Sequence, residues 1–305
     1  MVECNACGWT GNSFGPLWGH ESVVCPECGS FERHRAIIHY LERANVSLGQ
    51  ARVLEVGSGA ARAFKLYFER RGCEYFSLDL WPGHGTVRGD AAALPFKTGA
   101  FDVVISLHVL EHLGDDFEPL SEMFRVASRE GLVMAQVPYD DSRFDTIEHD
   151  IRPGLLGKSE YYDHHKRDYG LDIIERLGFF VRHVVEVHPL LFIPGGEARR
   201  HSFERNFGTT FFCSDSDLIC RLPGRLDRDL IPLKRRWLAE RRAYELYLAR
   251  NGQGGELQDW LQAEAEVGRL RDDEVARSNV FSLPGREEDA RAEGRGGRHS
   301  RAARR

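Results

Sequence analysis

Between Ala51 and Val137 the sequence alternates short β-forming runs with helical stretches, and this alternation limits the possible folds more than any other feature. The β-forming runs are ARVLEVG, YFSLDL, FDVVISL and GLVMAQV, and helical stretches such as Ala61–Arg71 and Asp116–Ala127 lie between them. Strands that alternate with crossover helices form a parallel sheet with helices on both faces. The sequence therefore predicts a doubly wound α/β body.

Two further strands and a helical region follow this body. Phe180–Val187 and Thr209–Cys213 are predicted strands, and an amphipathic helix is expected over Tyr169–Leu177. Beyond them, Leu233–Arg250 and Gly255–Leu270 have helical periodicity with a glycine-rich break between them, which predicts a hairpin of two helices.

The last residues are rich in arginine, glutamate and glycine and have no apolar period, so they are expected to be disordered. The predicted organisation is a head over residues 1–35, the α/β body over 36–215, a helical hairpin region over 216–282 and a basic tail over 283–305.

The overall charge restricts the possible partners. The chain has 41 Lys and Arg against 47 Asp and Glu, a net charge of −6, so it lacks the basic excess typical of nucleic-acid binding proteins. Its apolar runs are far shorter than the roughly 20 residues that span a bilayer, and the N-terminus has no secretory pattern. We expect a cytoplasmic protein without a membrane partner, in which the cysteines stay reduced.

Four of the seven cysteines form two C-x2-C pairs near the start of the chain. Cys4 and Cys7 are separated from Cys25 and Cys28 by seventeen residues, a spacing that brings four thiolates around one Zn2+. Four thiolates leave no open coordination position, so the expected role of the metal is structural. A redox-active dithiol and unpaired surface cysteines are the alternatives.

The first predicted strand ends in a glycine loop. Val53-Leu-Glu-Val-Gly-Ser-Gly-Ala-Ala places Glu55, Gly57 and Gly59 at the carboxyl end of that strand, where ligands bind in open α/β sheets. The glycines allow a ligand to approach the backbone, and twenty residues after Gly59 the second strand ends in Asp79, which is placed to accept both hydroxyls of a ribose. The third glycine of a dinucleotide fingerprint is missing.

The ordered series VLEVGSGAA, YFSLDL, GDAAALPF, FDVVISLHVLEHL and GLVMAQVPYD resembles the class I S-adenosylmethionine-dependent methyltransferases over about Arg52 to Asp215. The resemblance implies a Rossmann-like sheet of seven strands. It also implies S-adenosylmethionine as cofactor, with Glu55, Gly57 and Gly59 lining the methionine side and Asp79 at the ribose. Further along the chain, it places Asp90 and the Ala91 backbone at the adenine, and Ser106 to His108 at the sulfonium and the acceptor.

Two flanking regions carry weaker resemblances. Cys25-Pro-Glu-Cys-Gly-Ser-Phe-Glu-Arg-His-Arg resembles a segment that precedes some of these methyltransferase domains, and its Arg33, His34 and Arg35 either present cations to an anionic ligand or solvate the first helix. The predicted hairpin is similar to a small bacterial domain of unknown function, which suggests a bacterial source.

The segment from His108 to His112 also matches the pattern H-x-x-E-H. On a helix this pattern places two imidazoles around a catalytic zinc ion, with a carboxylate as base. Because His108 is expected at the end of a strand, the required helical geometry is doubtful, and peptidase chemistry is disfavoured. His112 is expected to be a packed, hydrogen-bonded residue.

Methyl transfer from a sulfonium is an in-line displacement, so the protein chiefly positions the acceptor and excludes water. An acceptor that carries a proton needs a base that titrates near neutral pH, for which histidine is suited. The candidates are His108, His149 and His164. His164 lies in the segment YYDHHKRDYG, which resembles a run in zinc-headed relatives, so that Asp163, His164, Arg167 or Tyr169 is expected to face the acceptor.

These observations favour a methyltransferase that acts on a small molecule and has a zinc-stabilised head. Two alternatives remain at this stage. One is an RNA methyltransferase that uses the head and the arginine-rich tail to bind phosphates, and the other is a non-catalytic module that binds proteins. The tail is the predicted contact for RNA or an acidic partner.

Overall fold

The computed structural model describes residues 1–17, 20–46, 48–150, 164–188, 200–201, 209–223, 231–250 and 255–271. The chain divides into two compact units, Met1–Leu226 and Asp227–Arg305. The predicted basic tail lies outside the described residues, as does Asp163. No helix in the described ranges combines the length and the apolar character needed to cross a membrane.

The first unit is built on a mixed sheet of seven strands in the order β12-β13-β9-β8-β5-β6-β7. Its strands are β5 (Arg52–Val56), β6 (Glu74–Asp79), β7 (Val87–Arg88), β8 (Phe101–Leu107), β9 (Ala127–Gln136), β12 (His183–Val187) and β13 (Thr210–Ser214). The first five of these pair in parallel, and β13 runs antiparallel to both of its neighbours. The predicted doubly wound, seven-stranded fold is confirmed.

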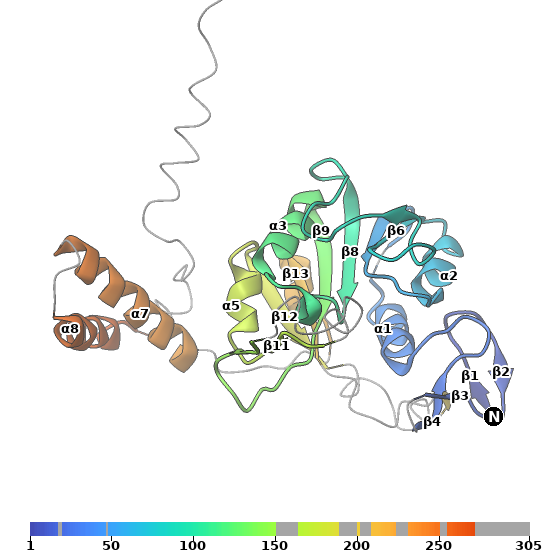
Figure 1. Ribbon diagram of the computed structural model, residues 1–305, viewed down its shortest axis with the longest axis horizontal. Coiled ribbons are helices and arrows are strands. Elements are labelled where there is room, and N and C mark those ends of the chain that lie inside the picture. Colours follow the sequence, from blue (N-terminus) through green and yellow to red (C-terminus); the bar gives the residue numbers. More distant parts are fainter. Residues whose placement is uncertain are drawn as a thin grey trace, which may run out of the picture. The chain divides into compact units, whose positions relative to one another are not determined.

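Helices cover both faces of this sheet (Figure 1). Helices α1 (Glu32–Arg43) and α2 (Ala63–Glu69) lie on one side, and α3 (Phe117–Val126) and α5 (Ile173–Gly178) lie on the other. Successive strand residues point to opposite faces, so Val53, Val103 and Ile105 join the apolar core under α1 and α2. Their neighbours Leu54 and Val104 are equally buried on the opposite face.

The cysteine-bearing head packs directly on this body. It consists of two short hairpins, β1 (Val2–Glu3) with β2 (Thr10–Gly11) and β3 (Gly15–Leu17) with β4 (His20–Val24). Cys4, Phe14 and Cys28 belong to the same apolar core as α1 and α2. The head and the body therefore share one hydrophobic core.

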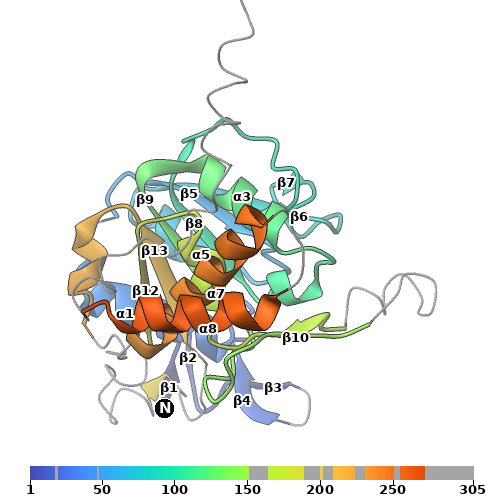
Figure 2. The ribbon, with the colours of Figure 1, turned by 90° about the vertical axis from the view of Figure 1, so that its left-hand side faces the viewer.

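The second unit contains the predicted pair of helices, α7 (Ile231–Ala249) and α8 (Glu256–Gly268), which lie against one another (Figure 2). Arg235 donates to the carbonyl oxygens of Val267 and Leu270, at 2.9 and 2.7 Å. Arg242 forms an ion pair with Glu266 at 2.6 Å. Arg235 thus donates to backbone carbonyls at the C-terminal end of α8, where carbonyls lack helical partners, and Arg242 adds a side-chain ion pair between the two helices.

Candidate functional site

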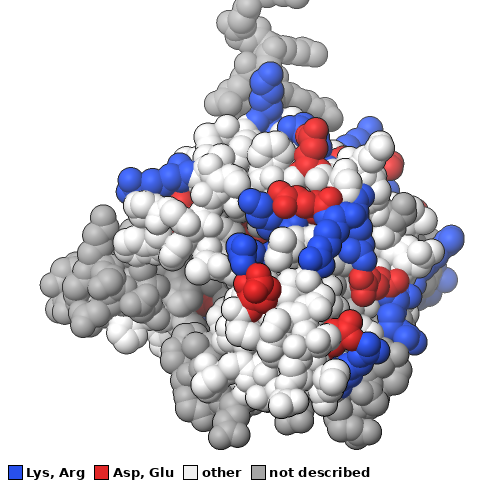
Figure 3. Space-filling model, turned by 90° about the vertical axis from the view of Figure 1, so that its right-hand side faces the viewer, with Lys and Arg blue, Asp and Glu red and all other residues white. Residues whose placement is uncertain are grey.

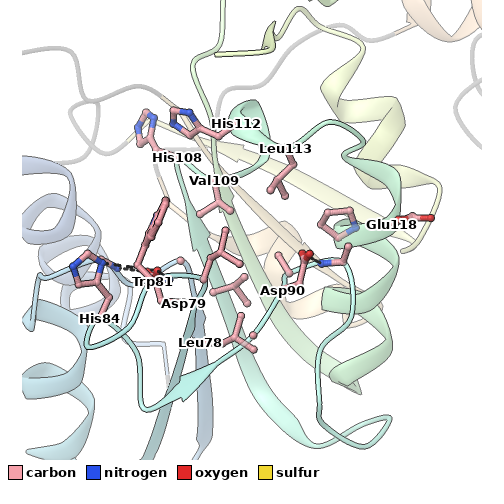
Figure 4. A pocket seen from close by; sticks show the side chains of 18 of the residues that line it. Leu78, Asp79, Trp81, His84, Asp90, His108, Val109, His112, Leu113 and Glu118 are labelled. Atoms are coloured by element: carbon pink, nitrogen blue, oxygen red, sulfur yellow. Dashed lines mark hydrogen bonds and ion pairs between the residues drawn. The ribbon is translucent and has the colours of Figure 1, made fainter. Parts of the chain in front are cut away.

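A cavity of about 390 Å³ opens at the carboxyl ends of β5, β6 and β8. Its size is within the range of small-ligand sites, and its position is the one at which open α/β sheets bind ligands. Six residues expected from the sequence line it: Gly57, Gly59, Asp79, Asp90, Ala91 and His108. Figure 4 shows His108 and His112 beside one another at one edge of the cavity, away from Asp79 and Asp90.

The glycine loop after β5 needs its glycines for two reasons. Gly57 has a φ of 73°, a conformation that residues with a side chain rarely adopt. A Cβ atom at this position would also lie 2.3 Å from Cγ2 of Val109 in the facing loop. The Gly57 N–H donates to the Leu78 carbonyl at 2.7 Å, which ties the loop to the end of β6. The bare backbone therefore forms one wall of the cavity.

Asp79 is the most tightly held acid in the cavity. Its side chain is 7% exposed, and it accepts hydrogen bonds from the backbone N–H groups of Gly59 and Trp81, each at 2.9 Å. His84 lies 3.9 Å away through Nδ1. These contacts fix the carboxylate between the glycine loop and the loop after β6, as a ribose ligand requires.

Asp90 and Ala91 lie in the loop after β7. One carboxylate oxygen of Asp90 accepts from the Ala92 N–H at 3.0 Å, which holds the turn. Among the described residues, the Ala91 N–H has no hydrogen-bond partner. This arrangement leaves a free donor beside a carboxylate at the cavity wall, as recognition of an aminopyrimidine edge requires.

Glu55 and Ser106 are not among the residues that line the cavity. Glu55 is buried within the sheet and accepts a hydrogen bond from the Tyr75 hydroxyl. Burial raises the pKa of Glu55 to about 8, and the neighbouring Asp79 acts in the same direction. Ser106 is also buried, and its hydroxyl has no partner among the described atoms.

His108 directly follows β8, at the start of the loop that lines one edge of the cavity. Its φ is 54°, unusual for a residue with a side chain, and its N–H donates to Gln136 at 2.8 Å. Nδ1 lies 3.0 Å from the fully buried carboxylate of Glu111. A buried carboxylate that holds one ring nitrogen fixes the tautomer and leaves the other nitrogen available as a base.

The other two candidate bases do not reach the cavity. His149 is half-exposed and contacts Asp168 at 3.0 Å, next to the short pair β10 (Ile147–Glu148) and β11 (Arg167–Asp168). His164 is exposed. Neither residue is among those lining the cavity.

Arg167 and Tyr169, which follow the undescribed stretch 151–163, form hydrogen bonds with the loop after β8, beside the cavity. Arg167 is buried and donates to the carbonyl oxygens of Leu110 and Gly114, each at 3.0 Å. The hydroxyl of the buried Tyr169 donates to Asp116 at 2.8 Å. Arg167 and Tyr169 therefore contact the protein's own loop, and neither is among the cavity-lining residues. The sequence pattern alone does not reveal these long-range contacts.

The four head cysteines form a cluster whose ligand atoms all lie within 4.8 Å of one another. The Sγ atoms of Cys4 and Cys28 are 3.7 Å apart, and those of Cys7 and Cys25 are 3.6 Å apart. Tetrahedral zinc with Zn–S bonds of about 2.3 Å requires sulfur separations of about 3.8 Å. The donor set and its dimensions therefore fit a structural zinc ion. Gly8 and Gly29 have positive φ and donate to the carbonyls of Cys4 and Cys25.

The two arginines of the segment that follows the head have different surroundings. Arg35 is fully buried on the Phe14 ring and donates to the carbonyl oxygens of Val23 and Ser30. It does not solvate the helix. Arg33 lies over the Phe31 ring, and its Nε has no hydrogen-bond partner among the described residues. Burial lowers the pKa of Arg33, while Glu111 opposes this shift.

Residues 54–135 match the family of proteins described as "Methyltransferase domain". An "Uncharacterized methyltransferase" of Mycobacterium sp. (strain KMS) is 35% identical over 97 residues, which are 28% of this chain and 38% of that protein. The chain thus spans well under half the length of this relative. Ajmaline N-methyltransferase of Rauvolfia serpentina is 50% identical over 40 residues, 13% of this chain and 14% of that enzyme.

Among solved structures, geranyl diphosphate C-methyltransferase from Streptomyces coelicolor A3(2) is similar with a TM-score of 0.39 and 14% identity, covering 63% of this chain and 87% of that one. The match to the methyltransferase family covers the glycine loop and strands β6 and β8, the elements that form the cavity. The chain therefore contains, over residues 54–135, a region that matches the methyltransferase domain family.

Proposed function

We propose that this protein transfers a methyl group from S-adenosylmethionine to a small-molecule acceptor, with His108 as the base that receives the acceptor's proton. The observation that carries the proposal is the cavity itself. It brings Gly57, Asp79 and Asp90 together with His108, a histidine held by a buried carboxylate.

Each part of the cavity has a distinct task in this proposal. The glycine loop admits the methionine end of the cofactor, Asp79 accepts from the ribose hydroxyls, and Asp90 with the Ala91 N–H contacts the adenine edge. Glu55 and Ser106 support the strand ends from behind the cavity wall. The bound cofactor supplies an electrophilic methyl group on a sulfonium, and His108 accepts the proton that a hydroxyl, thiol or ammonium acceptor must lose.

The charges around the cavity favour a small acceptor over RNA. Among the described residues, its lining contains carboxylates and imidazoles but no lysine or arginine, whereas binding of a phosphate backbone depends on such cations. On the surface that Figure 3 shows, basic and acidic side chains are interspersed and do not form a continuous basic field. Several charged side chains of the protein are paired, for example Arg71 with Glu42 at 2.5 Å.

In the same proposal the four cysteines hold one Zn2+ in a structural role. No coordination position remains for chemistry once four thiolates are bound. The buried Arg35 lies in the field of Cys4, Cys25 and Cys28, so its positive charge offsets part of the negative charge of a zinc–tetrathiolate centre.

Calorimetry with S-adenosylmethionine tests the cofactor site without knowledge of the acceptor. Wild-type, zinc-loaded protein is expected to bind one equivalent. Asp79→Ala removes a carboxylate that accepts several hydrogen bonds, each worth about 1.5–3 kcal/mol when one partner is charged, so affinity should fall at least tenfold. Asp102→Ala is the matched control, because Asp102 accepts from the Arg52 N–H outside the cavity. Equal loss in both variants, or no binding by the wild type, would overturn the proposal.

A further inference from the structure

The H-x-x-E-H segment does not form the helical metal site that its spacing resembles. Strand β8 ends at Leu107, His108 follows in a left-handed conformation, and only Leu110–His112 forms a short 3-10 turn. His108 therefore bonds to Glu111 rather than facing His112 from one side of a helix.

His165, from a distant segment, supplies the second imidazole of the cluster instead of His108. The ligand atoms of Glu111, His112 and His165 all lie within 4.8 Å of one another. His112 Nε2 is 3.9 Å from Glu111 Oε1, and the rings of His112 and His165 are 5.0 Å apart. The backbone holds this contact, because the Lys166 N–H donates to the Glu111 carbonyl at 2.6 Å.

Two polar atoms in this cluster are buried without a partner among the described residues. One is Oε2 of Glu111, whose side chain is 0% exposed, and the other is Nδ1 of His112. Leaving a buried polar atom unpaired costs about 1–3 kcal/mol, and more for a charged group. Arg33 interacts favourably with Glu111, but the two form no ion pair within 4.0 Å in the described part of the chain. The carboxylate thus has unused capacity to bind a cation.

The surroundings of the histidines suit metal ligation. A neutral imidazole can act as a metal ligand, and the His112 ring lies beside the Glu111 carboxylate. Nδ1 of His165 lies 3.9 Å from Asp168, within ion-pair distance but beyond hydrogen-bond distance. His165 is 43% exposed, so a metal ion can reach its ring from solvent.

We propose that Glu111, His112 and His165 form a second metal site, separate from the four cysteines, that binds a divalent transition-metal ion such as Zn2+. Two imidazoles and one carboxylate are ligands typical of such ions, and three protein ligands leave coordination positions open. His112 also lines the cavity. The role of this site rests on the proposed methyl transfer. An oxygen, nitrogen or sulfur atom of the acceptor occupies an open coordination position, and the metal makes the proton on that atom easier to remove.

Metal analysis of the full-length protein tests the site directly. After loading with Zn2+ and removal of excess ion, the wild type is expected to retain two equivalents per chain. His112→Ala and His165→Ala should each retain one, and Cys25→Ser with Cys28→Ser should also lose one. His183→Ala is the matched control, because His183 pairs with Asp217 at 2.7 Å outside the cluster and the cavity, and it should retain two.

Loading with Co2+ adds a spectroscopic identification. The head should give thiolate-to-cobalt charge-transfer bands, and the second equivalent should add only weak visible bands that disappear in His165→Ala. His108→Ala removes the hydrogen bond to Glu111, so the affinity of the second site for the metal should fall by about 10–100-fold. One equivalent in the wild type, or two in His165→Ala, would refute the site. Calorimetry with S-adenosylmethionine on the same samples separates this outcome from failure of the proposed function, because cofactor binding does not require the second metal.

Discussion

Two contacts fix the position of His108, one to its backbone and one to its ring. The backbone N–H is bound to Gln136 on β9, and Nδ1 is bound to Glu111. A left-handed conformation in a residue with a Cβ costs about 1–3 kcal/mol and persists only where the surroundings impose it. The protein thus uses stabilisation from neighbouring elements to hold one imidazole at the edge of the cavity.

The tautomer of His108 is therefore predictable. We expect the neutral ring to carry its proton on Nδ1, because Glu111 Oε1 accepts it, and to leave Nε2 unprotonated. In Glu111→Ala the preference should be lost. Long-range nitrogen–proton NMR correlations measure the tautomer without an acceptor. His183 is an internal control, since it contacts Asp217 through Nε2 and should keep its proton there in both proteins. An Nε2–H tautomer of His108 in the wild type would contradict the assignment.

The buried carboxyl of Glu55 leads to a prediction about how the free energy of unfolding depends on pH. Its pKa is raised to about 8 in the folded protein, mainly by burial, against a reference value of 4.5. Between these values the folded state keeps a proton that the unfolded state has lost, so the free energy of unfolding should fall as pH rises from about 5 to 8 and level off above. At about 1.4 kcal/mol per pKa unit, the loss is several kcal/mol at most.

Urea unfolding at pH 5 to 9 measures this effect. Glu55→Gln keeps a hydrogen-bond acceptor for Tyr75 and should flatten the decline. Glu74→Gln, on the exposed edge of the same sheet, should leave it unchanged, because Glu74 is 69% exposed. A decline of equal slope in Glu55→Gln would assign the effect to another group.

The residues that the sequence predicts best are those whose role follows from local chain geometry. Gly57 is recognisable because it ends a strand before a tight loop, and Asp79 because it ends the next strand. Glu111 and Arg35 are not recognisable in this way. The role of Glu111 depends on a single 3-10 turn and on a segment more than fifty residues later, and that of Arg35 on burial beneath the head. Periodicity carries no information about such contacts.

At the level of elements, the second cysteine knuckle supports the start of α2. The Cys28 carbonyl accepts from the Arg62 N–H at 2.8 Å, and Arg62 Nη2 donates to the Glu27 carbonyl at 2.7 Å. Arg62 precedes α2 directly and follows the glycine loop by three residues. This contact explains why the helix begins at Ala63 and not at the predicted Ala61. The head therefore fixes the far end of the loop that we assign to the cofactor.

Removal of the head metal should consequently affect two properties together. Cys25→Ser with Cys28→Ser, or chelation of the wild type, is expected to lower the unfolding temperature by about 10 °C or more, since roughly 1 kcal/mol shifts it by about 2–4 °C in a domain of this size. The affinity for S-adenosylmethionine should fall by about tenfold, because the glycine loop loses its support. Thermal unfolding and calorimetry measure the two effects.

Cys73→Ser serves as the control for this experiment, because Cys73 is buried at Leu48, outside the metal cluster. It should retain the affinity for the cofactor. Unchanged cofactor affinity in metal-free protein that is still folded would show that the head acts on stability alone.

The order of the elements follows from the sequence more reliably than their ends do. All four predicted strands between Ala51 and Val137 are present, because each is a buried run of β-forming residues flanked by turn residues. The last of them begins at Ala127, four residues before the predicted start. Its first residues, Ala127 to Glu130, are small or polar and partly exposed, so they have no alternation of apolar residues that would predict a strand. Ala127 pairs with Phe101 of β8, and the register shifts before the next pair.

At the scale of the whole molecule, the cavity and the four-cysteine cluster both belong to the first compact unit. Every residue that lines the cavity lies between Val56 and Pro119, and the cysteine cluster ends at Cys28. The second unit begins at Asp227, and its two helices are joined by their own contacts, such as the Arg242–Glu266 ion pair. The two units are thus predicted to fold separately.

A chain that ends at Leu226 should therefore fold, retain its zinc and bind S-adenosylmethionine with a dissociation constant within about twofold of the full-length value. The reason is that no residue described after Leu226 belongs to the core around α1 and α2 or lines the cavity. Calorimetry and thermal unfolding of both chains provide the comparison. Asp79→Ala in the shortened chain should weaken cofactor binding as strongly as in the full chain. Loss of binding on shortening alone would instead assign the second unit a direct part in forming the cofactor site.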